Sequence, residues 1–282
     1  MSFVPQNTLR AASLAFFTGL GITITAAGAL AADAMDAEPP QVPAFDKERF
    51  ENKPAEADWN LIVGGGAMYE PKYEGSGGLK ISPVPFAVFT YGDWLEVDPT
   101  GVTLTPVHYA DFSLAANVGY ESGRDESDHA ALRGLGDIDF AATLGLKATY
   151  ELGPLDLYAG LDQTLGGSES LIGKLGVGYT APVTEKLILK ANAEAVFANE
   201  KHMQAYFGVN GAQSAASGMP KYKPEAGLKR VDISASATYL LTENWLIRGE
   251  AGLGLLTGDA ADSPIVKEKL QPSAGLFVGY KF

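Results

Sequence analysis

The chain has 282 residues, a formal net charge of −13, 33 glycines and no cysteine. The missing cysteines exclude disulfide bonds and thiolate metal sites, and the negative charge argues against a nucleic-acid partner, which needs a basic surface. No apolar run of transmembrane-helix length follows the first 32 residues, and abundant glycine suits tight turns and crowded sheets better than helices.

Residues 1–31 are organised like a secretory signal. Arg10 supplies a positive charge, residues 14–27 are apolar or small, and Ala29-Leu30-Ala31 offers an A-x-A cleavage site. A transmembrane anchor is the alternative, but Gly19 and Gly21 interrupt an apolar segment that is already short. We therefore expect the protein to be exported.

Residues 32–58 have a different composition, rich in Pro, Glu, Asp and Ala, with Pro39, Pro40, Pro43 and Pro54 close together. Such a stretch has too few apolar side chains to fold alone. We expect a disordered periplasmic tail before a barrel that occupies residues 59–282.

The front of that region predicts strands at 59–69, 80–91 and 110–121. Residues 93–98 and 101–107 are each too short to cross a bilayer alone. Counted as two strands they give a total of twelve, an even number with both termini in the periplasm. Counted as one they give eleven, which breaks the parity of bacterial barrels. We prefer twelve, with ten and fourteen as open alternatives.

The clearest strand is predicted at 138–152, where Ile138, Phe140, Leu144 and Leu146 belong to a strict alternation that ends at Leu152. Further strands are expected at 155–165, 171–182, 186–199, 229–241 and 245–257. All are long enough to supply the roughly 9–11 residues that a tilted transmembrane strand needs, and longer than the usual strand of a soluble sandwich.

The last stretch, residues 270–282, also alternates and ends on Phe282, with Tyr280 two positions earlier. A terminal strand of this kind resembles the assembly signal of bacterial outer-membrane barrels. Short turns alternate with longer polar loops, and aromatic residues gather near strand ends, as membrane barrels require. The sequence therefore predicts an all-β protein, a single antiparallel transmembrane β-barrel in the lipid of the outer membrane, in preference to a soluble exported sandwich.

Charged residues fall on the faces expected to point into the barrel. The set comprises Asp162, Lys174, Lys190, Glu194, Arg248 and Glu250. Opposite charges on neighbouring strands can pair, so these side chains would either line a narrow pore or close the barrel as a salt-bridged plug. The pattern does not decide between the two.

Catalytic and metal-binding patterns were sought as well. His108, His129 and His202 are not spaced as metal ligands. The segment 167–174 has five residues between its glycines and Leu175 where a phosphate loop needs Ser or Thr, and no G-x-S-x-G elbow occurs. The acidic residues at 125–128 suggest a solvated loop more readily than a calcium site. We expect no enzyme activity, cofactor or metal.

Several segments carry a more specific resemblance. They are Gly-Gly-Gly-Ala-Met-Tyr-Glu-Pro-Lys-Tyr-Glu-Gly-Ser at 64–76, Ser-Pro-Val-Pro-Phe at 82–86, and further stretches at 123–128, 132–137, 204–209, 213–218, 226–229 and 258–265. Together they resemble the MipA/OmpV family over essentially the whole chain from Trp59 onward.

This resemblance implies an outer-membrane protein of the MltA-interacting type. It implies a scaffold that links a murein-degrading lytic transglycosylase with a bifunctional murein synthase, a penicillin-binding protein. Other members of the family are described as porin-like proteins or adhesins, so a channel for small solutes and a surface adhesin acting through the 200–228 loop stay open as alternatives.

Overall fold

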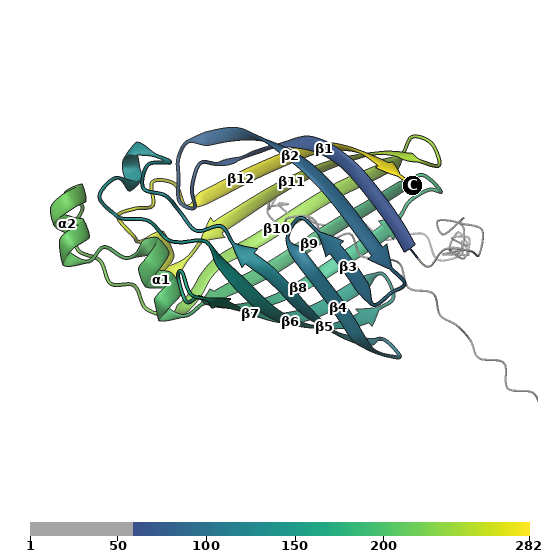
Figure 1. Ribbon diagram of the computed structural model, residues 1–282, viewed down its shortest axis with the longest axis horizontal. Helices are drawn as coiled ribbons and strands as arrows, with labels where there is room; N and C mark the ends of the chain where they lie inside the picture. The colour runs from purple at the N-terminus through teal and green to yellow at the C-terminus, as the bar shows by residue number, and fades with distance from the viewer. Residues whose placement is uncertain (1–58) are drawn as a thin grey trace, which may run out of the picture.

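The computed structural model describes residues 59–282, which form a closed barrel of twelve antiparallel strands (Figure 1). Each strand pairs with its neighbours in sequence, and β1 pairs with β12 to close the wall. The prediction of a twelve-stranded outer-membrane type of barrel is confirmed. The predicted signal sequence and tail lie outside the described residues.

The first six strands are β1 (Trp59–Pro71), β2 (Leu79–Tyr91), β3 (Leu95–Asp98), β4 (Gly101–Tyr109), β5 (Phe112–Glu121) and β6 (Ala141–Leu152). The other six are β7 (Leu155–Leu165), β8 (Leu171–Pro182), β9 (Leu187–Ala198), β10 (Gly227–Leu240), β11 (Trp245–Leu256) and β12 (Leu270–Lys281). The loops contain α1 (Glu200–Phe207), α2 (Gly211–Ser217), α3 (Gly258–Ala261) and a 3₁₀ turn, η2 (Ala130–Leu132). None of the helices within residues 59–282 has the length and apolar character needed to span a bilayer.

The alternation of side chains gives the wall an apolar outer face and a mostly polar inner face. On β6, Leu144, Leu146 and Tyr150 are exposed on the outside, while Lys147 alternates with them and projects inward. In water such a belt would be a very large exposed apolar patch. In a bilayer it is the surface that contacts lipid.

The terminal strand fastens the barrel closed. β12 pairs with both β11 and β1, and the amide of Phe282 donates to the carbonyl of Leu61 at 2.9 Å. Tyr280 packs its ring against Trp245 and Phe282, with centroids 5.1 and 4.9 Å away. The two residues predicted as an assembly signal therefore lie in an aromatic cluster at the closing seam.

Three details differ from the sequence expectation. Residues 138–140 precede β6, and Ile138 forms only an isolated bridge to Arg124. A bulge between Leu228 and Arg230 lies near the start of β10, which extends to Gly227. The long loop predicted at 200–228 folds largely into α1 and α2, because Asn199 and Asn210 cap the two helices.

Candidate functional site

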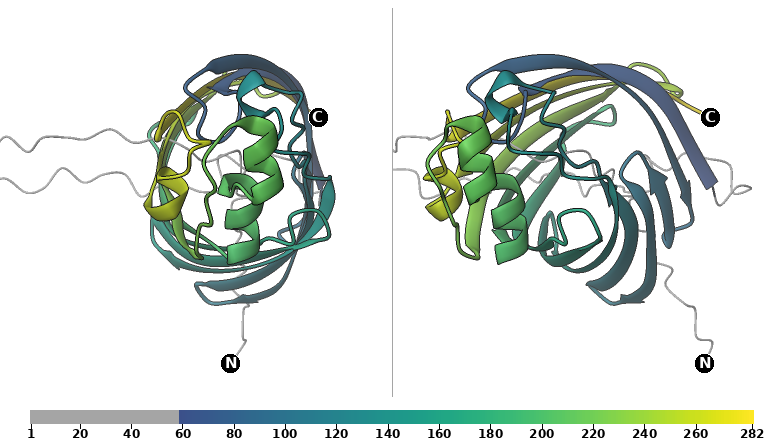
Figure 2. Two further views of the ribbon diagram at one scale, coloured as in Figure 1. Left: turned by 90° about the vertical axis from the view of Figure 1, so that its left-hand side faces the viewer. Right: turned by 60° about the vertical axis from the view of Figure 1, so that its left-hand side comes forward.

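The end of the barrel that carries the long loops is covered by folded segments. Figure 2 (left) looks onto this end and shows α1 and α2 lying across it, with the η2 segment and α3 at the sides. Phe207 of α1 and Ile265 after α3 are fully buried in two apolar clusters that hold these segments together. By the rule that long loops are extracellular and short turns periplasmic, this end is the extracellular mouth.

A partly buried ion network fixes the loops to the wall at the mouth. Glu74, between β1 and β2, contacts Lys229 at 3.1 Å and Arg230 at 3.0 Å, both on β10. Arg230 also donates to the buried Asp232 at 2.8 Å. Burial by itself would raise the pKa of Glu74, but the positive charges of Lys229 and Arg230 outweigh it and lower this pKa to about 2. Glu74 is therefore ionised at every physiological pH.

His202 continues this network into α1. Its Nε2 lies 3.2 Å from Nζ of Lys229, and its Nδ1 lies 2.8 Å from the hydroxyl of Ser170. Ser170 in turn contacts Ser168 and Glu121, the last residue of β5. Burial and the nearby charges of Lys229 and Arg230 lower the pKa of His202 to about 3. The imidazole is thus neutral and holds the helix down over the mouth.

The serine, histidine and glutamate of this network do not form an accessible catalytic site. Ser170 is completely buried and His202 nearly so, so a substrate cannot reach the hydroxyl. Elsewhere His108 lies 3.8 Å from Asp93, and His129 caps η2. No group of three or more histidine, aspartate or glutamate side chains in residues 59–282 gathers as a metal site.

The six predicted lumen charges lie on the inward faces of β7, β8, β9 and β11, and the structure brings some of them together. Asp162 and Lys174 form an ion pair at 2.9 Å across the β7–β8 ladder. Arg248 and Glu250 pair at 3.0 Å along β11. Glu194 accepts a hydrogen bond of 2.7 Å from the hydroxyl of Tyr158.

Two further lysines project into the lumen, where the charges of Glu96 and Asp156 act on both. Among the residues that the structure describes, neither Lys190 nor Lys147 makes an ion pair. Lys147 instead lies over the ring of Tyr158, 4.4 Å from its centroid. Gly176 leaves room for this ring, because a Cβ there would lie 2.3 Å from it. The sequence assigned Lys190 to the lumen but not Lys147 or Tyr158, although their inward positions follow from the same alternation.

An apolar cluster inside the barrel was not predicted from the sequence. Ile62, Met68, Phe86, Val88, Leu246 and Phe277 are buried together on the inner faces of β1, β2, β11 and β12. Phe86 and Phe277 pack edge to face, with ring centroids 6.1 Å apart. The inner surface is therefore divided into an apolar wall and a charged wall.

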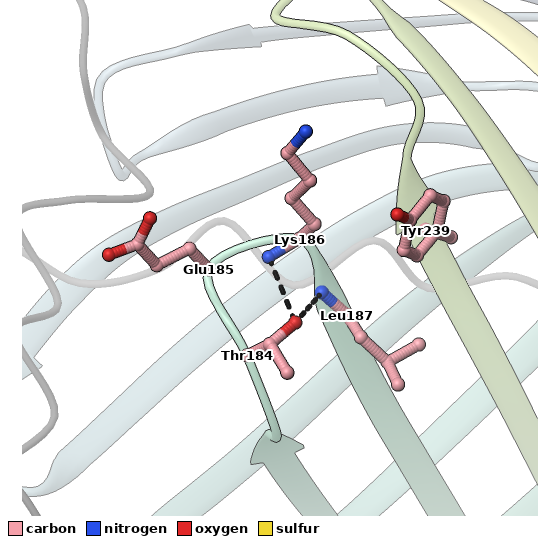
Figure 3. A pocket seen from close by; sticks show the side chains of 5 residues that line it. All are labelled: Thr184, Glu185, Lys186, Leu187 and Tyr239. Carbon is pink, nitrogen blue, oxygen red and sulfur yellow. Dashed lines mark hydrogen bonds between the residues drawn. The ribbon is translucent and has the colours of Figure 1, made fainter.

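Within residues 59–282, the segments that join the strands at the opposite end of the barrel are short turns. Figure 3 shows the turn between β8 and β9, with an open recess lined by Thr184, Glu185, Lys186, Leu187 and Tyr239. The Thr184 hydroxyl accepts hydrogen bonds from the amides of Lys186 and Leu187 at 3.2 and 3.0 Å. The turn is thereby held rigid, and the side chains of Glu185 and Lys186 extend away from it (Figure 3).

A closed antiparallel barrel with an apolar outer belt, aromatic rings at the strand ends and a partly charged interior is a transmembrane β-barrel of the bacterial outer membrane. Residues 63–282 match the family model described as MltA-interacting protein MipA, and the chain belongs to this family. The predicted family and the predicted location in the outer membrane are both confirmed.

Solved structures similar to this chain include proteins of the bacterial outer membrane. OmpT of Vibrio cholerae is 10% identical, with a TM-score of 0.38 and coverage of 80% of this chain and 97% of that one. OmpF of Salmonella typhi in complex with daunomycin is 12% identical, with a TM-score of 0.39 and coverage of 80% and 97%. The channel DcaP of Acinetobacter baumannii is 12% identical, with a TM-score of 0.40 and coverage of 79% and 96%. A comparison with curated protein sequences finds no match.

Proposed function

We propose that this protein is a non-enzymatic scaffold of the outer membrane that holds a murein-cleaving lytic transglycosylase at its periplasmic face. The observation that carries the proposal is the family match over residues 63–282, since the family is named for its interaction with MltA. The covered extracellular mouth favours a scaffold over an open pore, because α1 and its ion network lie across the solute path.

The contact surface of the scaffold would be the periplasmic turns, together with the tail predicted at 32–58. The β8–β9 turn is well suited, because its backbone is held by the Thr184 hydroxyl and it carries one side chain of each charge, Glu185 and Lys186. Rigid presentation lowers the entropic cost of binding. A murein synthase of the penicillin-binding type would complete the assembly by contacting the bound transglycosylase or another part of the same face.

The test is binding of a purified lytic transglycosylase to the protein in lipid nanodiscs. Binding is expected with the mature chain, and it should weaken when Glu185 and Lys186 are both replaced by alanine. The matched control replaces Lys267 and Glu268 at the extracellular end. If the mature chain binds no transglycosylase, the scaffold proposal is wrong.

A channel for small solutes is the second candidate function. It is supported by one observation: Lys147 and Lys190 face the lumen and form no close ion pair within residues 59–282, so they could attract anions. A channel predicts unitary conductance steps in planar bilayers, and their ion selectivity should shift toward cations when Lys190→Glu is introduced. A barrel that passes no current excludes this function.

A further inference from the structure

An open recess of about 500 Å³ lies where β9 and β10 reach the periplasmic end of the barrel (Figure 3). The β8–β9 turn forms one side of it, and Leu187 and Tyr239, which are paired in the ladder between the two strands, form the other. Tyr239 faces outward on β10 and is exposed. Tyrosine rings of membrane proteins gather at the boundary between hydrocarbon and water. The recess therefore lies at the level of the lipid headgroups.

Three hydrogen-bond donors line this recess, namely the ammonium of Lys186 and the hydroxyls of Thr184 and Tyr239. Within residues 59–282, Lys186 forms no ion pair and neither hydroxyl donates a hydrogen bond, since the Thr184 oxygen only accepts from two backbone amides. In Figure 3 the carboxylate of Glu185 extends in a different direction from the ammonium of Lys186. Donors gathered around one recess without an acceptor suit an anion.

The charge of this turn sets it apart from the other periplasmic turns in residues 59–282. Lys186 is the basic residue among the turns at 92–94, 110–111, 153–154, 183–186 and 241–244, whereas Asp93, Asp111 and Glu243 are acidic. A lysine at the end of a membrane-spanning strand can extend its ammonium to the level of the headgroup phosphates. An anionic headgroup is therefore attracted to the β8–β9 turn more than to the other turns.

From the recess toward the middle of the membrane, the outer face of the wall consists mainly of small side chains. We call these residues the alanine strip: Ala191, Ala193, Ala235, Ala237, Gly249 and Ala251, which are outward-facing neighbours on β9, β10 and β11. Larger exposed side chains flank the strip, with Tyr179 of β8 opposite Ala191 and Leu276 of β12 opposite Gly249.

Packing within the wall does not require the strip to be so small. A Cβ at Gly249 would meet no atom within 4 Å, although a glycine inside a strand weakens the strand. Such a glycine often marks a place where a ligand approaches the backbone closely. Because this face of the barrel contacts lipid, the ligand that fits it is an acyl chain.

We propose that the recess and the alanine strip bind one anionic phospholipid from the membrane leaflet that faces the periplasm. Lys186 holds the phosphate, with hydrogen bonds from the hydroxyls of Thr184 and Tyr239, and an acyl chain packs over Leu187 and along the strip. Free phosphate would use the head site alone, whereas continuity of the recess with the strip selects an intact lipid. The inference goes beyond the scaffold function, because lipid binding needs no protein partner.

The first test is native mass spectrometry of the full-length mature barrel released from nanodiscs with equal amounts of phosphatidylglycerol and phosphatidylcholine. The wild type should retain phosphatidylglycerol preferentially. Lys186→Gln should retain about tenfold less of it, as expected for loss of a charge-assisted hydrogen bond, and Lys186→Arg should retain it. The matched control Lys223→Gln removes an exposed lysine from the extracellular end and should behave as wild type. Equal retention of the two lipids by the wild type, or an unchanged preference in Lys186→Gln, would overturn the proposal.

The second test separates the acyl chain from the head. Ala235→Leu keeps all three donors but fills the strip, so it should weaken retention of phosphatidylglycerol severalfold, while a leucine on a lipid-facing strand is compatible with folding. Phosphatidylglycerol with a diazirine in its acyl chain should label peptides from 187–195 and 231–239, and it should label them less in Lys186→Gln. Even labelling of the whole outer wall, or displacement by soluble glycerol phosphate as effective as by phosphatidylglycerol, would refute the lipid site.

Discussion

The ion network at the mouth can be broken at one residue, Glu74. The change Glu74→Gln leaves Lys229 and Arg230 in place, with their side chains 8% and 27% exposed, but removes the carboxylate that both contact. The pKa of Glu74 falls from an ordinary 4.5 to about 2, which corresponds to about 3 kcal/mol at 1.36 kcal/mol per pKa unit. Breaking a buried pair by removal of one partner costs about 3–5 kcal/mol by mutation. The two figures agree.

Because Lys229 also contacts His202 of α1, we expect this cost to appear as local opening of the mouth. Hydrogen–deuterium exchange of the α1 amides should accelerate about a hundredfold in Glu74→Gln. Lys229→Met added to the variant should restore part of the protection, since it removes the uncompensated charge. The control is Glu200→Gln, which breaks the exposed pair with Lys223 and should change exchange little. Equal exchange in Glu74→Gln and Glu200→Gln would refute the role of the network.

Three further predictions concern the mouth and the closing seam. In the folded protein the pKa of His202 is about 3, against an ordinary 6.5, so its contribution to the stability of the mouth is full above pH 6.5 and is lost as the pH falls toward 3. Hydrogen–deuterium exchange of the α1 amides should therefore accelerate over this pH range, and it should accelerate less in His202→Gln. Exchange in the wild type that does not depend on pH would contradict the assignment. Gly66→Val should prevent barrel closure, because a Cβ at this position would lie 2.2 Å from the carbonyl oxygen of Leu276. The readout is loss of the heat-modifiable band in gel electrophoresis. The control Gly65→Val should fold, because a Cβ there would lie 3.8 Å from the nearest atom. Deletion of Phe282 should slow insertion into vesicles, since its ring and amide both fasten the seam, and normal insertion kinetics would argue against a part in assembly.

The wall of the barrel could be predicted from the sequence because it depends on a local, repeating pattern. Alternation in 138–152 and 270–282 reports which side chains face lipid, and a strand needs no distant information to show this pattern. The division of residues 93–107 into two short strands followed from parity and is confirmed. The bulge near the start of β10 was missed, because a single inserted residue leaves no clear signal in the alternation.

The mouth could not be predicted, because its contacts join residues far apart in sequence. Glu74 lies in the loop between β1 and β2, whereas Lys229 lies on β10, 155 residues further along the chain. The sequence near either residue does not identify the other as its partner. Lys147 was detectable in principle, since it alternates with the outward leucines of β6. The apolar wall was hidden for a different reason: Phe86 and Phe277 occupy inward positions, where alternation predicts polar side chains.

Reconstitution of the purified mature chain in a planar bilayer tests the central claim most directly, namely that this barrel is a scaffold with a covered mouth. At neutral pH the wild type should pass no current, while Glu74→Gln should show intermittent steps as the mouth opens. Regular conductance steps from the folded wild-type barrel would contradict the account and identify the protein as a channel.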